Sequence, residues 1–104
     1  FYGQFSTNNK RDGLCCMSMD GKVMWKTMRN PLFDKGSMIL ADGLILATDG
    51  RQTLYLIEPD PSGFKPLASA QILDMGQNWA PIALVDGKLL IRDQAKLKCV
   101  KVTK

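Results

Sequence analysis

The chain has 104 residues, a formal net charge of +4 and no histidine. This length supports one modest hydrophobic core, and no stretch approaches the roughly 20 consecutive apolar residues that a transmembrane helix needs. Without histidine the chain cannot form a Ser-His-Asp triad, and its three cysteines are not spaced as zinc ligands.

Short strands follow one another from the first residue onward. Three strands are expected in the first thirty residues, separated by a polar turn at 7–12 and by a hairpin turn at Asp20-Gly21. A long connection at 29–36, interrupted by proline and glycine, ends this unit. No window shows sustained helical periodicity, so no helix is expected. The three expected strands cover residues 1–6, 14–19 and 23–27.

The next two units share a pattern in which an Asp-Gly pair separates two apolar runs. Asp42-Gly43 and Asp86-Gly87 lie 44 residues apart. Asp-Gly in this setting is a strong hairpin signal, because a type I′ turn needs two residues that tolerate positive φ. The first hairpin would place Leu40 opposite Ile45. Strands are expected at 37–41, 44–48, 53–58 and 64–72 in the middle unit, and at 80–85, 88–92 and 97–102 in the last.

Several of these strands are continuously apolar, as in 38–41, 44–47 and 54–57. An antiparallel sheet with one wet face would alternate apolar and polar residues. Continuous runs joined by tight turns predict a meander covered on both faces, which a radial stack of small sheets provides. A four-stranded repeat of about 40 to 45 residues is typical of a β-propeller. The expected fold class is all-β, with antiparallel meander blades forming about two and a half blades of a β-propeller.

These blades form one partial domain, 1–104, with blade boundaries near 1–30, 36–73 and 79–104. A complete propeller needs roughly four to eight blades, and the chain begins at Phe1 rather than at Met. The sequence therefore predicts the C-terminal portion of a longer protein. Open strand edges and apolar flanks promote pairing between chains, so a homo-oligomer is expected. The alternative is a self-sufficient small β domain, such as a sandwich or an incomplete barrel.

The stretch Leu14–Lys26, which ends in Gly-Lys-Val-Met-Trp-Lys, resembles the PQQ-type (pyrroloquinoline quinone-like) β-propeller repeat. The hairpin Asp86-Gly87-Lys88 and the closing pattern at 96–100 are also similar to that family. The resemblance implies one of two kinds of protein. Some members are quinoprotein dehydrogenases that hold PQQ and calcium on the propeller axis, and others bind no quinone and act as scaffolds in the bacterial envelope.

The chain departs from this repeat in the second blade, where Leu67 occupies the place of the docking tryptophan. That departure favours a non-catalytic binding or scaffolding protein. The alternative is part of a PQQ-dependent alcohol dehydrogenase-like quinoprotein, for which PQQ and calcium would be implied in the parent protein. No cofactor is expected in this chain itself. By the resemblance, the protein would lie in the periplasm or cell envelope and would bind a protein partner or its own remaining blades.

The best candidate for a binding surface is the rim formed by the loops that precede innermost strands, since loops on a rigid scaffold often carry function. Trp79 follows the polar connection 74–78 and precedes such a strand. In a propeller these loops surround one mouth of the central channel. The alternative is that Trp79 caps the core and the polar side chains are solvated. The candidate rim residues are Lys35, Arg51, Gln77, Asn78 and Trp79.

The pair Cys15-Cys16 has two interpretations. Quinoprotein alcohol dehydrogenases carry a vicinal disulfide near the cofactor, but adjacent residues of a strand point to opposite faces of the sheet. Cys16 also occupies the repeat position of Leu56 and Cys99. A buried core position is therefore expected.

The repeated aspartates and the basic residues near the C-terminus each have an explanation that involves no ligand. The repeated aspartates fall at turns, where Asp is favoured for backbone reasons, so no calcium site is expected. Basic residues gather near the C-terminus, but without aromatic interleaving or an RNA-binding motif they favour an edge that resists aggregation over a nucleic-acid surface. The aspartates are Asp42, Asp49, Asp86 and Asp93, and the basic residues are Lys88, Arg92, Lys96, Lys98, Lys101 and Lys104.

Overall fold

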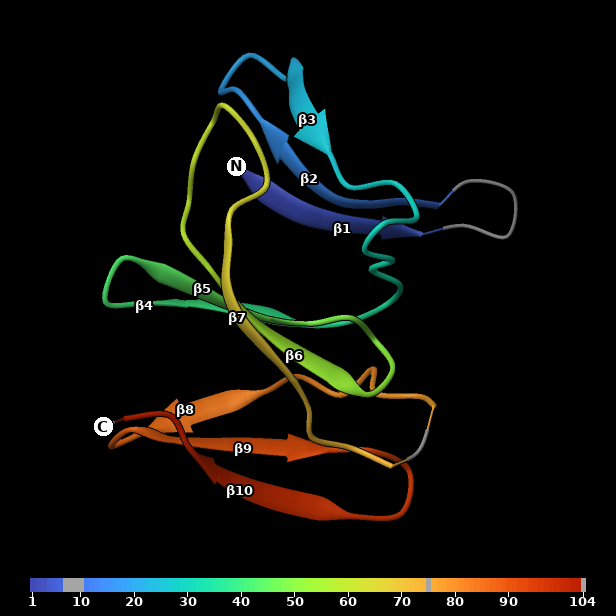
Figure 1. The fold of residues 1–104 in the computed structure, drawn as a ribbon, viewed down its shortest axis with the longest axis vertical. Coiled ribbons are helices and arrows are strands. Elements are labelled where there is room, and N and C mark those ends of the chain that lie inside the picture. Colours follow the sequence, from blue (N-terminus) through green and yellow to red (C-terminus); the bar gives the residue numbers. More distant parts are fainter. Residues whose placement is uncertain (7–10, 75, 104) are drawn as a thin grey trace.

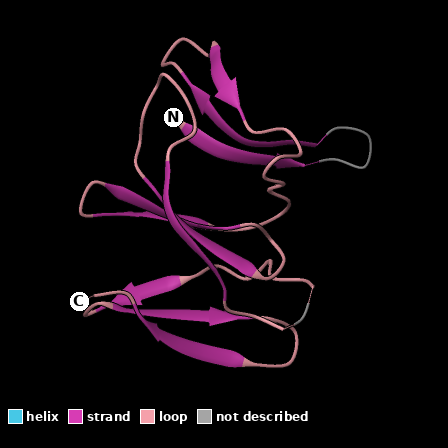
Figure 2. Ribbon diagram, in the orientation of Figure 1, coloured by secondary structure: helices cyan, strands magenta, loops and turns pink. Residues whose placement is uncertain are grey.

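The structure, a computed structural model, describes residues 1–6, 11–74 and 76–103. Across these residues it forms ten β-strands and no helix, arranged in three antiparallel sheets of three, four and three strands (Figure 1, Figure 2). The all-β meander architecture expected from the sequence is confirmed. The strands are β1 (Tyr2–Ser6), β2 (Arg11–Met17), β3 (Val23–Lys26), β4 (Met38–Ala41), β5 (Leu44–Thr48), β6 (Thr53–Ile57), β7 (Pro66–Gln71), β8 (Ala83–Val85), β9 (Lys88–Arg92) and β10 (Leu97–Lys101).

Both Asp-Gly hairpins form as expected. Between β4 and β5, Asp42 and Gly43 have positive φ values of 51° and 74°. Between β8 and β9, Asp86 and Gly87 have values of 49° and 71°. Leu40 lies opposite Ile45 in the first hairpin. Two successive residues with positive φ define the type I′ turn, whose twist matches that of the flanking strands.

The starts of β2 and β8 differ from the expected ones for reasons that the structure shows. β2 begins at Arg11, within the segment expected as a turn, because its backbone continues to pair with β1. Residues 7–10 of that segment lie outside the described residues. β8 begins only at Ala83. Pro81 has no N–H to donate to a strand ladder, and Ile82 donates its N–H to Ser37 Oγ at 3.3 Å.

The central strands of the second sheet, β5 and β6, are covered on both faces, whereas β7 is exposed along its whole length. Ile45 and Ala47 of β5 belong to a buried cluster with Leu14 of the first sheet. Leu46, which lies between them, belongs to a separate cluster with Leu89 of the third sheet. Successive side chains of a strand point to opposite faces, so both faces of β5 are buried. This two-sided burial explains why the strands of this sheet are continuously apolar and lack the alternation of a half-wet sheet.

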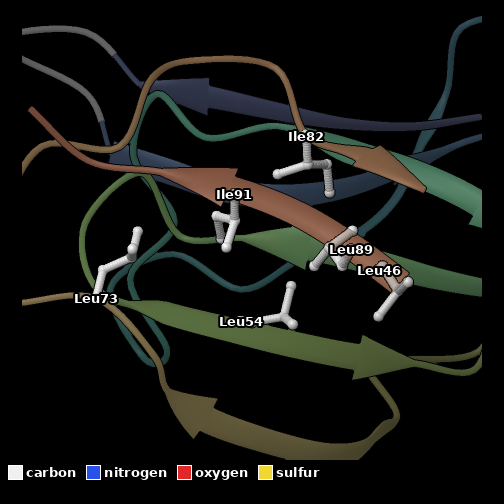
Figure 3. Packing of buried hydrophobic residues seen from close by; sticks show 6 residues of the cluster. All are labelled: Leu46, Leu54, Leu73, Ile82, Leu89 and Ile91. Atoms are coloured by element: carbon white, nitrogen blue, oxygen red, sulfur yellow. The ribbon is translucent and has the colours of Figure 1, made fainter. Parts of the chain in front are cut away.

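The first interface, between the first and second sheets, is rich in aromatic rings. Phe33 is fully buried there, and its ring centre lies 4.9 Å from that of Tyr55 and 6.0 Å from that of Phe64. The second interface, between the second and third sheets, is aliphatic. Burial of each such side chain contributes about 1.5–3 kcal/mol to stability. The buried residues of the second interface, drawn in Figure 3, are Leu46, Leu54, Leu73, Ile82, Leu89 and Ile91.

The third sheet has one buried and one open face. Along β9, Leu89 and Ile91 are buried in the second interface, whereas Leu90 between them is exposed. Ala83 on β8 and Cys99 on β10 lie opposite Leu90 and are exposed as well. These three residues, the open row, form an uncovered apolar strip on the third sheet. The third sheet lies at one end of the stack of sheets (Figure 1).

Candidate functional site

The connections that carry the candidate rim residues lie on one side of the molecule. The β5–β6 turn, the β7–β8 connection and the β9–β10 turn lie at the right of Figure 1, opposite the β4–β5 and β8–β9 hairpins. Lys35, in the segment before β4, places its Nζ 4.9 Å from the ring centre of Trp79. The Trp79 side chain is 51% exposed. An ammonium group at this distance is attracted to the face of the indole ring.

Asn78 is the buried member of the rim, with 1% of its surface exposed. Its backbone N–H donates to the Gly50 carbonyl at 2.9 Å. A Cβ atom at Gly50 would lie 2.8 Å from the backbone nitrogen of Lys35, so glycine at this position allows the three segments to converge. Neither polar atom of the Asn78 side chain has a hydrogen-bond partner among the described residues. An unmet buried polar group costs about 1–3 kcal/mol.

A shallow pocket of about 170 Å³ lies at the same rim. Gln94 Nε2 donates a hydrogen bond to Gln77 Oε1 at 2.5 Å, joining the β9–β10 turn to the β7–β8 connection. Arg92 and Gln94 are rim residues that sequence reasoning missed. The available signal was the repeat, which relates their turn to the β5–β6 turn carrying Arg51. The pocket is lined by Gln77, Trp79, Ala80, Arg92, Asp93 and Gln94.

The structure brings most of the candidate rim residues together. Lys35 contacts Trp79, Asn78 is bonded to the β5–β6 turn, and Gln77 shares the pocket with Trp79. Arg51 is exposed in the β5–β6 turn, where its backbone N–H donates to Asp49 Oδ1. Trp79 does not cap the core, because half of it is exposed, and Asn78 is buried rather than solvated. The rim presents an exposed indole ring, an ammonium group over that ring and the side-chain amides of Gln77 and Gln94.

The aspartates at the β5–β6 and β9–β10 turns serve the backbone. Asp49 Oδ1 accepts two N–H groups of its own turn, at 2.8 and 3.1 Å. Asp93 Oδ1 does the same at 2.8 and 2.7 Å. Side-chain bonds of this kind explain why Asp is favoured in turns. Among the described residues, no group of three or more metal-ligating side chains comes together.

Cys15 and Cys16 are free thiols, each only 4% exposed. Cys16 lies opposite Trp25 in the β2–β3 ladder. Burial raises the pKa of the Cys15 thiol, and the negative charge of Asp12 raises it further. A thiol with a raised pKa holds its proton and is a weak nucleophile. The expectation of a buried core position is confirmed for Cys15 and Cys16. It is wrong for the equivalent Cys99, which is exposed because no sheet covers the outer face of β10.

The docking position of the second blade is a correction to the sequence analysis. Leu67 was expected there, but Ala68 lies opposite Leu56 in the β6–β7 ladder, as Trp25 lies opposite Cys16 in the β2–β3 ladder. The ladder is irregular at this point, with Ile57 opposite Pro66, so Leu67 has no partner in register. The register shift is a β-bulge, which a sequence pattern does not reveal. A cleft of about 450 Å³ opens beside Ala68 in the second interface.

Comparisons with known proteins found no matching family model, no matching curated protein and no matching solved structure. The resemblance to the PQQ-type repeat therefore remains a prediction based on the residues that carry it. Among the described residues, no helix has the length and apolar character needed to span a membrane.

Proposed function

We propose that this chain is a non-catalytic binding or scaffolding portion of a PQQ-like repeat β-propeller. The observation that carries this proposal is the repeated way in which each sheet contacts the next. Sheets of three or four strands, connected in sequential order and stacked face to face, are the elements from which a propeller is built.

Equivalent rows of residues face the next sheet along the chain. In each row, residues on neighbouring strands lie opposite one another in register. The row of the first sheet contributes to the first interface, and the row of the second sheet contributes to the second. The row of the third sheet is the open row. The rows are Tyr2, Cys16 and Trp25; Leu46, Leu56 and Ala68; and Ala83, Leu90 and Cys99.

The open row is the surface on which a further blade would pack. Its central residue, Leu90, occupies the same place as Cys16 and Leu56, which are buried and partly buried in the two internal interfaces. That blade would come from the protein's own remaining blades or from a protein partner. For the isolated chain, the expected partner is a second copy of the same chain. An uncovered apolar strip flanked by strand edges promotes such association. By resemblance, we place the protein in the bacterial periplasm or cell envelope.

Size-exclusion chromatography with light scattering tests this proposal. The chain is expected to form a multimer at micromolar concentration, and Leu90→Lys is expected to return it to the monomer by placing a charge in the open row. Met19→Lys is the matched control, because Met19 is 85% exposed in the β2–β3 turn, away from the open row. A wild-type chain that stays monomeric at every concentration would contradict the proposal.

The quinoprotein alternative is tested in the same measurement by adding PQQ and calcium. The quinone is expected to elute separately from the protein, and the multimer is expected to be unchanged. Coelution of quinone with the chain, abolished by removing calcium, would instead favour the alcohol dehydrogenase-like alternative.

A further inference from the structure

The second interface contains a mainly apolar cleft of about 450 Å³. Leu46, Leu54 and Leu56 of the second sheet form one wall, and Ala68 and Ala70 of β7 extend it. The β8–β9 hairpin and the residues after β10 form the opposite wall, through Leu84, Gly87, Val102 and Thr103. Small-molecule sites are commonly hollows of roughly 300–1,000 Å³ with mainly apolar walls.

The cleft has a physical cause in the repeat. Ala68 is equivalent to Trp25, because each lies opposite the matching residue of the preceding strand, Leu56 and Cys16 respectively. Tyr2 and Leu46 are likewise equivalent, because Tyr2 lies opposite Cys16 and Leu46 lies opposite Leu56, each on the strand that neighbours the central one on its other side. A row that contains Tyr and Trp in the first interface contains Leu and Ala in the second. The second interface therefore lacks one aromatic side chain in the place where the first has an indole.

The contacts of Trp25 show what this position holds when it is filled. The indole ring centre lies 6.0 Å from that of Tyr2 and 6.0 Å from that of Phe64. Its Nε1–H donates to the Asp60 carbonyl at 2.7 Å. A smaller cavity of about 340 Å³ remains elsewhere in the first interface, lined in part by Tyr2 and Leu40 but not by Trp25.

The walls of the cleft are held in place by the backbone around them. Leu46, Leu54 and Leu56 lie on β5 and β6, the two central strands of the only four-stranded sheet in the described part of the chain. On the other side, Val102 donates its N–H to the Gly87 carbonyl at 2.9 Å, which ties the chain after β10 to the β8–β9 hairpin. The cleft is open on the side of β7, where Ala68 and Ala70 are exposed, so a small molecule can enter it from solvent and bury its apolar surface against the leucines.

We propose that the cleft binds a small, neutral molecule with a fused aromatic ring, of which indole is the simplest form. The ring would lie against Leu46, Leu56 and Ala68, in the place that the Trp25 ring takes in the first interface. Thr103 and Asp42, which also line the cleft, carry a hydroxyl and a carboxylate that can accept a hydrogen bond from a ring N–H. This inference needs only the equivalence of the two interfaces and does not depend on whether the sheets form part of a ring.

Titration of the 104-residue protein with indole, followed through the methyl NMR signals of leucine, alanine and valine, tests the proposal. Signals of Leu46, Leu54, Leu56 and Ala68 are expected to shift together and to saturate. Ala68→Trp is expected to weaken indole binding by at least about tenfold, because the new side chain fills the cleft. Leu67→Trp is the matched control, since it adds the same side chain to the same strand at a residue that does not line the cleft.

The outcomes separate this inference from the proposed function. Leu90→Lys is expected to keep indole binding even as it disrupts the multimer, because Leu90 lies on the opposite face of the third sheet from the cleft. If Ala68→Trp does not fold, Ala68→Leu replaces it in the titration. Ala68→Leu is also expected to weaken indole binding, because its larger side chain occupies part of the cleft. Binding that is unaffected by both Ala68 variants, or shifts confined to the first interface, would overturn the proposal.

Discussion

The side chains of Trp25 and Ala68 decide how the two interfaces differ. Both occupy the same position of the repeat, on the strand after the one that carries Cys16 or Leu56. Trp25 joins a cluster of aromatic rings and is hydrogen-bonded to the Asp60 carbonyl. Such rings contribute through their large buried area and through edge-to-face packing. At the residue scale, the position that Trp25 fills with aromatic packing in the first interface is occupied in the second by the small Ala68, beside the cleft.

Trp25→Ala is expected to destabilise the fold by about 3–5 kcal/mol, because it removes a large side chain from between two sheets and leaves a cavity. Val23→Ala, on the same strand, is the control, since Val23 is 48% exposed and its truncation is expected to cost less than about 1 kcal/mol. Urea denaturation, followed by circular dichroism of the backbone rather than by tryptophan fluorescence, measures the free energy of unfolding of both variants. Equal losses of stability would show that Trp25 does not support the first interface.

At the scale of single elements, the tight turns place the sheets and the rim. Gly43 in the β4–β5 hairpin and Gly50 in the β5–β6 turn both have positive φ, 74° and 79°. Their surroundings differ, because a Cβ at Gly43 would meet nothing within 4 Å, whereas one at Gly50 would meet the backbone nitrogens of Lys35 and Gly36 at 2.8 and 2.9 Å. The β5–β6 turn therefore touches the segment before β4, and the hairpin projects freely.

Gly43→Ala is expected to cost about 1–2 kcal/mol, the cost of placing an L-residue in the left-handed region. Gly50→Ala is expected to cost clearly more, because the backbone of residues 35–36 must also move. The same displacement is expected to separate Lys35 from Trp79 and to change the fluorescence of Trp79. Chemical denaturation of the two variants side by side makes the comparison, and an equal loss in both would contradict the close contact at Gly50.

At the scale of the whole molecule, the three sheets form a stack measuring 36 × 32 × 19 Å that ends in the open row (Figure 1). Basic side chains stand on the same exposed face of the third sheet. Lys88, Arg92 and Lys101 are exposed on β9 and β10, beside Leu90 and Cys99. Their repulsion opposes the packing of two such faces, while the apolar row favours it.

Self-association of the chain is therefore expected to strengthen as salt concentration rises. Salt screens repulsion between exposed charges, with a Debye length near 10 Å at 0.1 M and about 3 Å at 1 M, but leaves apolar burial intact. Light scattering at a fixed protein concentration across this range is the measurement. Association that weakens with salt would show that ion pairs, rather than the open row, hold the copies together.

Much of the architecture was predictable from local sequence. Asp42-Gly43 marks a type I′ hairpin because the two residues themselves tolerate positive φ, whatever surrounds them. The continuous apolar runs around Leu46 and Leu56 predicted burial on both faces, and both faces are buried. β8 begins later than expected because Pro81 has no N–H for a strand ladder, and because the Ile82 N–H is donated to Ser37, a residue far along the chain.

The sequence by itself determined the all-β class, the strand count and the hairpins, because turn chemistry and strand periodicity act between neighbouring residues. Only the tertiary structure decided that Ala68 rather than Leu67 stands opposite Leu56, that a cleft opens beside it, and that Asn78 is buried while Trp79 is exposed. These features depend on strand register and on contacts between sheets, which join residues distant in the chain and leave no local pattern.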